Sequence, residues 1–182
     1  MIIELGDFFS SQKSSFPLDL CFSPEDGADA TGMIPAEMKI KENGIILKGE
    51  IRSVGDYLSL YSTVTVRYGA VCDRCLAPFE AETSFGFDRQ IVASQKKGVL
   101  PKDGEEEEPL AVEEGKIDLT EPLSEAIALE APTVYLCRED CPGLCPTCGK
   151  MRDDPACRCS EKKEIDPRFE ILKKLLDNSS EV

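Results

Sequence analysis

The sequence predicts an α+β protein, in which an antiparallel β-sheet domain with few helices precedes a cysteine-rich, zinc-ribbon-like module and a terminal helix. Alternating polar and apolar residues indicate strands, paired cysteines have metal-ligand spacing, and two segments have helical periodicity. Of the 182 residues, 41% are hydrophobic, which suffices for one ordinary domain with a small metal-dependent appendage. We expect an acidic β-rich domain over residues 1–136 and a zinc-binding module with a C-terminal helix over residues 137–182.

The sheet is predicted to begin between residues 38 and 51. Two strand-like stretches flank Asn43-Gly44 there, and an Asn-Gly dipeptide is the strongest short-range signal of a β-hairpin. We therefore expect two antiparallel strands joined at this dipeptide.

Further strands are predicted on either side of the first cysteine pair. Polar and apolar residues alternate from Thr63 to Tyr68, as a half-buried strand requires. Strand character returns over residues 79–92, with Phe85 and Phe87 on one face. The Cys-x2-Cys pair between them is thus expected in the connection between two paired strands, where a metal ion would fix the end of the hairpin.

Residues 95–115 are predicted to form a flexible acidic loop. They combine a run of four acids, Glu105 to Glu108, with glycine and proline and lack apolar periodicity. The charge can attract a basic partner, or the segment can be only a solvated insertion.

One helix is predicted from about Thr120 to Pro132. Thr120 is a plausible N-cap, Pro132 ends the helix, and one face is formed by Leu123, Ala126, Ile127 and Glu130.

A last helix is predicted to start at Asp166-Pro167, with Asp166 as its cap. Its apolar stripe either packs against the domain or binds a partner, and consists of Phe169, Leu172, Leu175 and Leu176.

Eight of the nine cysteines fall into two groups with metal-ligand spacing, and we predict that they bind two zinc ions. Four thiolates without histidine or carboxylate form a closed structural site, and the chain contains no histidine. Gly149 is expected to adopt the positive φ of a tight metal knuckle. Open alternatives are ligand exchange between the groups, a single zinc site, disulfides and a redox pair. The predicted ligands are Cys72, Cys75, Cys137 and Cys141 for one site, and Cys145, Cys148, Cys157 and Cys159 for the other.

The ninth cysteine, Cys21, lies apart from these groups in an apolar stretch. We expect a small buried core residue there rather than a reactive thiol.

The net charge of −14 is unevenly distributed. Residues 1–136 carry 12 Lys and Arg against 25 Asp and Glu, whereas residues 137–182 carry 9 against 10. An acidic body argues against broad nucleic-acid binding and favours basic protein partners, although the charge can also serve solubility alone.

The sequence also predicts a soluble protein of the reducing cytoplasm. The N-terminal residues lack a basic region followed by a long apolar run, and no segment approaches the roughly 20 apolar residues of a membrane span. We expect neither a membrane partner nor a small-molecule substrate.

Four motifs, taken in order, resemble the bacterial YceD family, the large ribosomal RNA subunit accumulation proteins. They are Cys72-Asp73-Arg74-Cys75-Leu76 after a strand, Ile117-Asp118-Leu119 before a helix that ends at Pro132, Cys141-Pro-Gly-Leu-Cys145-Pro-Thr-Cys148-Gly149, and Asp166-Pro167-Arg168 before the last helix. The resemblance covers most of the chain. It implies a role in the synthesis, processing or stability of 23S rRNA, and it brings no catalytic residue.

The leading hypothesis is therefore a non-enzymatic factor for the large ribosomal subunit. It would contact 23S rRNA or its precursor, a basic large-subunit ribosomal protein, or both. The RNA-facing residues would come from the near-neutral C-terminal part. They are Arg138, Lys150, Arg152, Arg158, Lys162 and Lys163.

The alternative is a zinc-ribbon adaptor between proteins that has no connection with rRNA. An enzyme is poorly supported, because Cys72 and Cys75 follow a strand instead of opening a helix, as a thioredoxin-like redox pair would. The acids also show no converging pattern for the magnesium of a nuclease.

Overall fold

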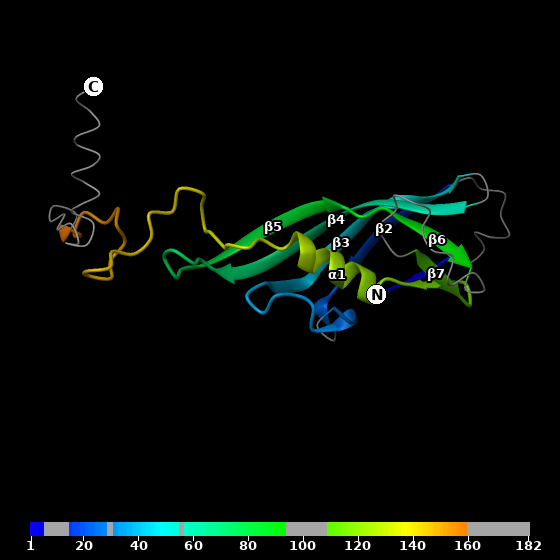
Figure 1. Ribbon diagram of the computed structural model, residues 1–182, viewed down its shortest axis with the longest axis horizontal. Helices are drawn as coiled ribbons and strands as arrows, with labels where there is room; N and C mark the ends of the chain where they lie inside the picture. The colour runs from blue at the N-terminus through cyan, green and yellow to red at the C-terminus, as the bar shows by residue number, and fades with distance from the viewer. Residues whose placement is uncertain (6–14, 29–30, 55–56, 94–108, 160–182) are drawn as a thin grey trace, which may run out of the picture. The chain divides into compact units, whose positions relative to one another are not determined.

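The computed structural model describes residues 1–5, 15–28, 31–54, 57–93 and 109–159. The chain forms two compact units, Met1–Cys137 and Arg138–Val182. The first unit is rich in strands and contains one α-helix in its described part (Figure 1). Its elements are β1 (Ile2–Glu4), β2 (Ser15–Phe22), a short 3-10 helix (Pro24–Asp26), β3 (Lys39–Val54), β4 (Tyr57–Val71), β5 (Pro78–Gly86), β6 (Arg89–Ala93), β7 (Leu110–Glu113), β8 (Lys116–Asp118) and α1 (Thr120–Glu130).

The strands form one mixed sheet in the order β1-β8-β7-β6-β4-β3-β2, and β5 also pairs with β4. All pairs are antiparallel except β6 and β7, which are parallel. The expectation of a purely antiparallel sheet is therefore wrong at this point. A parallel pair requires a long connection, and residues 94–109 between the two strands provide one.

Asn43-Gly44 does not form the predicted hairpin. Strand β3 runs through the dipeptide, and its pairing with β4 shifts between Ile40 and Ile45. Asn43 adopts a φ of +50°, and a Cβ on Gly44 would lie 2.7 Å from the backbone oxygen of Arg67 on β4. The dipeptide thus supplies the left-handed residue and the close backbone approach of a β-bulge.

Strand β4 shows the predicted alternation, with Val64, Val66 and Tyr68 buried and Thr63 and Arg67 exposed. The predicted strand over residues 79–92 is instead divided into β5 and β6, which pair with different parts of β4.

The break between β5 and β6 is held by Ser62 of β4. Its hydroxyl donates to the carbonyl of Phe87 at 2.6 Å, and its amide donates to Asp88 Oδ1 at 3.0 Å. Phe87 is fully buried and Phe85 is half-buried, so both contribute to the core.

Helix α1 packs into the same core through Leu123, Ala126 and Ile127, whereas Glu130 is exposed. Thr120 is not its cap: the helix begins at this residue, whose amide donates to Asp118 Oδ1 at 2.8 Å. The helix ends at Glu130, before Pro132, because the residue preceding a proline is pushed out of the helical region.

Three other expectations differ from the structure or lie beyond its described residues. Residues 110–113 form β7, so the predicted acidic loop is wrong at its end, and residues 95–108 lie outside the described residues. The predicted final helix also lies outside them. Cys21 is exposed, because the alternation along β2 buries its neighbour Phe22 instead. No described helix is long and apolar enough to cross a membrane.

Candidate metal centre

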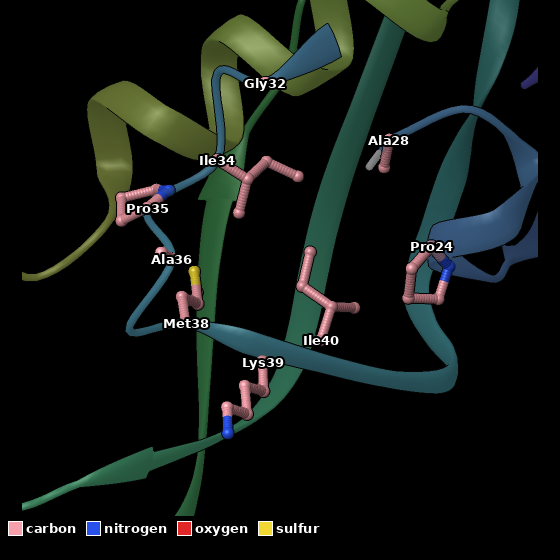
Figure 2. A pocket seen from close by; sticks show the side chains of 9 residues that line it. All are labelled: Pro24, Ala28, Gly32, Ile34, Pro35, Ala36, Met38, Lys39 and Ile40. Atoms are coloured by element: carbon pink, nitrogen blue, oxygen red, sulfur yellow. The ribbon is translucent and has the colours of Figure 1, made fainter. Parts of the chain in front are cut away.

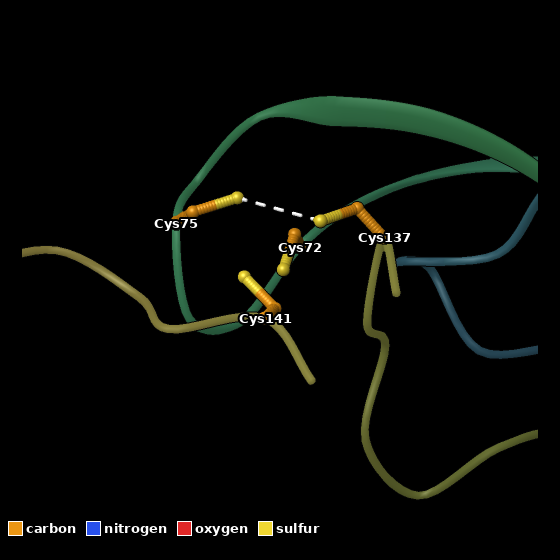
Figure 3. A group of neighbouring side chains, drawn as sticks. All are labelled: Cys72, Cys75, Cys137 and Cys141. Carbon is orange, nitrogen blue, oxygen red and sulfur yellow. Dashed lines mark hydrogen bonds between the residues drawn. The ribbon is translucent and has the colours of Figure 1, made fainter. Parts of the chain in front are cut away.

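The structure gathers eight cysteines into the two groups of four that their spacing predicts. Within each group, the four Sγ atoms lie within 4.8 Å of one another. Zn–S bonds of about 2.3 Å in a tetrahedron place sulfur atoms about 3.8 Å apart. The distance between the Sγ atoms of Cys75 and Cys137 is 3.7 Å (Figure 3), and that between Cys148 and Cys157 is also 3.7 Å. Both groups therefore have dimensions that suit a tetrahedral zinc ion.

The first group is built on the turn between β4 and β5. Its Cys-x2-Cys pair lies in the connection between two paired strands, as the sequence predicts. The amide of Cys72 donates to the carbonyl of Ala77 at 2.9 Å, and the amide of Leu76 donates to the carbonyl of Cys72 at 2.8 Å. These bonds close a tight knuckle, in which Leu76 adopts a φ of +60°. Cys72 and Cys75 are buried, and Cys141 is buried as well.

Asp73 ties this knuckle to the segment that carries Cys137. The backbone amide of Asp73 donates to the carbonyl of Tyr135 at 2.8 Å, and the amide of Tyr135 donates to Asp73 Oδ2 at 2.7 Å. Tyr135 is buried, and its ring meets Tyr68 of β4 edge-on, with the ring centres 6.1 Å apart. The sheet core thus fixes the segment that presents Cys137, two residues after Tyr135, to the knuckle.

The second group is built on a knuckle of the same design. The amide of Cys145 donates to the carbonyl of Lys150 at 2.7 Å, and the amide of Gly149 donates to the carbonyl of Cys145 at 2.8 Å. In both knuckles, the first cysteine therefore accepts from the residue four positions later and donates to the residue five positions later. Gly149 has a φ of +70°, as predicted. An isolated antiparallel bridge between Leu144 and Met151 flanks the turn.

Electrostatics around the first knuckle favour a thiolate. Burial acts to raise the pKa of Cys72, but hydrogen bonds from the backbone amides of Cys137, Cys75 and Arg74 outweigh burial and lower this pKa to about 6. Cys72 is therefore ionised at neutral pH, which is the form that binds a metal ion.

In the second group, the pKa of one thiol is lowered and the pKa values of two others are raised. Backbone amides of Cys148 and Thr147 lower the pKa of Cys145 to about 6. The neighbouring Cys148 sulfur raises the pKa of Cys159 to about 12. A backbone hydrogen bond from Cys159 acts to lower the pKa of Cys157, but burial and the sulfurs of Cys148 and Cys145 outweigh it and raise this pKa. The group loses its first proton easily and resists the later ones, because negative charges accumulate within a few ångströms. A bound cation would compensate this charge.

The candidate RNA-facing residues differ in whether an acid already pairs with their charge. Arg138 is held by Asp153, with 2.6 Å between nitrogen and carboxylate oxygen, and by Asp140 at 3.5 Å. Lys150, Arg152 and Arg158 are exposed, whereas Lys162 and Lys163 lie outside the described residues.

Several basic side chains in the described part of the first unit lie beside acids. Ion pairs there connect a lysine or arginine to a carboxylate. They are Lys41–Glu80, Lys48–Asp19, Arg52–Glu50, Arg67–Glu82 and Lys116–Glu4.

A hollow of about 280 Å³ lies between the 3-10 helix and the start of β3 (Figure 2). Most of its lining side chains are apolar, among them Ile34, Met38 and Ile40, and Lys39 is the one titratable residue of the lining. The lining therefore contains no acid–base pair.

Sequence reasoning missed Asp73 and Tyr135, which shape the site, and the left-handed backbone of Leu76. The available signals were an acid inside the first Cys-x2-Cys pair and a leucine at the position where the second pair is followed by Gly149. Neither signal indicates a partner by itself, because the contact between Asp73 and Tyr135 joins residues 62 positions apart.

The chain is similar to uncharacterized proteins of mycobacteria. An uncharacterized protein of Mycobacterium tuberculosis and one of Mycobacterium bovis are each 29% identical over 163 residues, which cover 88% of this chain and 76% of theirs. One of Mycobacterium leprae is 29% identical over 118 residues, which cover 64% of this chain and 54% of its own. No solved structure matches. Residues 60–176, which contain both cysteine groups, match the family described as "Large ribosomal RNA subunit accumulation protein YceD", and the chain therefore belongs to the YceD family.

Proposed function

We propose that this protein is a non-enzymatic, zinc-stabilised factor that supports the synthesis, processing or stability of 23S rRNA during assembly of the large ribosomal subunit in the cytoplasm. Family membership suggests the link to large-subunit rRNA accumulation. The observation that carries the rest is the pair of all-cysteine groups, because four thiolates would fill the coordination of zinc and leave no position for substrate.

The two zinc ions would be held by the two cysteine groups. Zinc would supply a crosslink in the second unit, where no described residue belongs to the hydrophobic core and where Pro142, Pro146 and Pro155 leave little room for regular structure. The backbone amides around Cys72 and Cys145 already favour the thiolates that such an ion requires.

The two units offer different surfaces to a ribosomal precursor. Exposed Lys150, Arg152 and Arg158 of the second unit can face phosphate. The first unit has 12 basic against 25 acidic residues, and at least five of its described basic residues are engaged in ion pairs, so it suits a basic ribosomal protein.

Tagged purification from cells, with and without ribonuclease, tests the proposal. The expected result is recovery of 23S rRNA or a large-subunit protein, together with a lower 23S rRNA level on depletion of the chain. Unchanged 23S rRNA on depletion would instead support an adaptor unrelated to rRNA.

A matched pair of variants separates the two surfaces. Reversing Lys150 and Arg152 to Glu should reduce recovery of RNA if the second unit faces phosphate. Reversing Lys48 and Arg67 to Glu makes the same change of charge on the first unit and should leave RNA recovery unchanged. Equal effects of the two double variants would mean that the loss follows net charge and not a specific surface.

A further inference from the structure

We propose that the tip of the first knuckle, with Leu76 at its centre, is a docking point for a basic segment of a protein partner. This inference rests on the proposed function, because it specifies where the acidic unit would engage a basic protein.

The conformation of Leu76 is the first observation. Its φ is +60°, a left-handed conformation that brings the Cβ of an L-residue too close to the following carbonyl oxygen. The second knuckle has the same two backbone hydrogen bonds and places Gly149 at the corresponding position. Glycine therefore satisfies this turn without strain, and the turn itself does not require leucine.

The exposure of Leu76 is the second observation. Its side chain is 65% exposed, so folding buries little of it in return for the strained backbone. Strained residues that the fold does not require are concentrated at binding sites. A partner that covers the side chain would account for both features.

Two other exposed apolar residues surround the same turn, and we call the three residues the knuckle patch. Val71 is 52% exposed and pairs with Pro78, two residues after Leu76. Val134 is 54% exposed and precedes Tyr135, which is bonded to Asp73 of the knuckle. Clustered exposed apolar side chains are typical of protein contacts.

The charge of the unit selects the kind of partner. Met1–Cys137 carries 12 Lys and Arg against 25 Asp and Glu. Arg74 lies in the knuckle itself, beside Asp73. Farther from the patch, Lys41 is paired with Glu80 and Arg67 with Glu82, so the excess of acids in the unit is not offset there. Nucleic acid would be repelled, whereas a protein segment with an apolar side chain between Lys and Arg residues complements both the patch and the field around it.

Site-specific photocrosslinking in the full-length, tagged chain tests this proposal. A photoreactive phenylalanine analogue at position 76 should crosslink to a basic protein, and the crosslink should survive ribonuclease. The same analogue at Leu129, which is 78% exposed on α1, is the control and should not crosslink to that protein.

Leu76→Gly supplies a second measurement that does not depend on damage to the fold. The variant should retain its zinc content and its thermal midpoint, because glycine suits the left-handed turn. Tagged purification of this variant, without crosslinking, should recover at least about tenfold less of the basic protein that the crosslink at position 76 identifies, as expected for an interface anchor.

Several results would overturn the proposal. These are a crosslink from position 76 to RNA, to an acidic protein or to another part of the chain, equal capture from position 129, or full recovery of the partner by Leu76→Gly. A lower thermal midpoint of that variant would show that Leu76 serves the fold.

The level of 23S rRNA separates failure of this proposal from failure of the proposed function. If depletion lowers 23S rRNA but position 76 captures no basic protein, the docking point is wrong and the function stands. If position 76 captures a basic protein while 23S rRNA is independent of the chain, the docking point stands and the function is wrong.

Discussion

Replacing Asp73 by alanine should weaken zinc binding at the first cysteine group and not at the second. The carboxylate of Asp73 accepts the backbone amide of Tyr135 at 2.7 Å, and this bond holds the segment that carries Cys137 against the knuckle. Alanine removes the acceptor and leaves only the bond from the residue 73 amide to the carbonyl of Tyr135.

The size of the effect follows from the type of bond. A hydrogen bond to a charged group contributes about 1.5–3 kcal/mol. If this whole contribution positions Cys137, and about 1.4 kcal/mol corresponds to tenfold in affinity, zinc binding at the first group weakens by about 10- to 100-fold. Asp73→Asn keeps a carbonyl acceptor and should recover part of the loss.

Competition for zinc against a chromophoric chelator measures the effect, with the two groups resolved as two phases of the titration. Asp88→Ala is the matched control. Asp88 Oδ1 also accepts a backbone amide, that of Ser62 at 3.0 Å, and lies in the same unit, but it positions no cysteine. Asp73→Ala should shift one phase, and Asp88→Ala should shift neither. The reasoning is refuted if both variants weaken binding equally or if Asp73→Ala shifts both phases.

Three other predictions concern the fold and the second group. Cys145→Ser should abolish amide-exchange protection in the second unit and spare β3 and β4, so uniform loss across the chain would contradict the two-part organisation. Gly49→Ala should reduce the free energy of unfolding in urea by about 1–3 kcal/mol, because its Cβ would lie 2.1 Å from the carbonyl oxygen of Tyr61, whereas Gly86→Ala, with open space around it, should cost less. Zinc affinity of the second group should increase with pH above neutrality, because the raised pKa of Cys159, about 12, keeps a proton there that zinc must displace; a pH-independent affinity between about pH 7 and 9 would contradict this.

The parts of the fold that were predicted correctly depend on local sequence. Strand β4 was predicted from alternation, which is a property of neighbouring residues, and its register follows from the apolar face that must be buried. The left-handed conformation of Gly149 was predictable for the same reason, because a knuckle between two closely spaced cysteines leaves few alternatives.

The incorrect predictions required information from elsewhere in the chain. The Asn43-Gly44 dipeptide favours left-handed backbone both in a hairpin turn and in a β-bulge. It forms a bulge here because β3 pairs with β4 on both sides of it. The parallel pairing of β6 with β7 depends on the long connection between them. The prediction that Cys21 is buried is wrong because neighbouring residues of a strand lie on opposite faces, and in β2 the buried face contains Phe22.

The two cysteine groups share a knuckle and differ in what surrounds it, which should make their dependence on metal unequal. The first knuckle joins two paired strands, and Asp73 and Tyr135 connect it to the buried face of the sheet. Among the described residues of the second unit, one isolated bridge, between Leu144 and Met151, flanks the second knuckle. Without zinc, the hydrogen bonds of the sheet can still hold the first knuckle, whereas the described residues around the second knuckle keep local turns.

Removal of zinc by a chelator should therefore act in two stages that amide exchange can distinguish. The second unit should lose protection at a chelator concentration that leaves the amides of Cys72 and Leu76 protected, since their acceptors belong to the turn between β4 and β5. A protein treated in this way should regain protection in the second unit when zinc is returned, because the first unit has stayed folded. Simultaneous loss at both knuckles would mean that the sheet does not preserve the first one, and that metal defines both sites to the same degree.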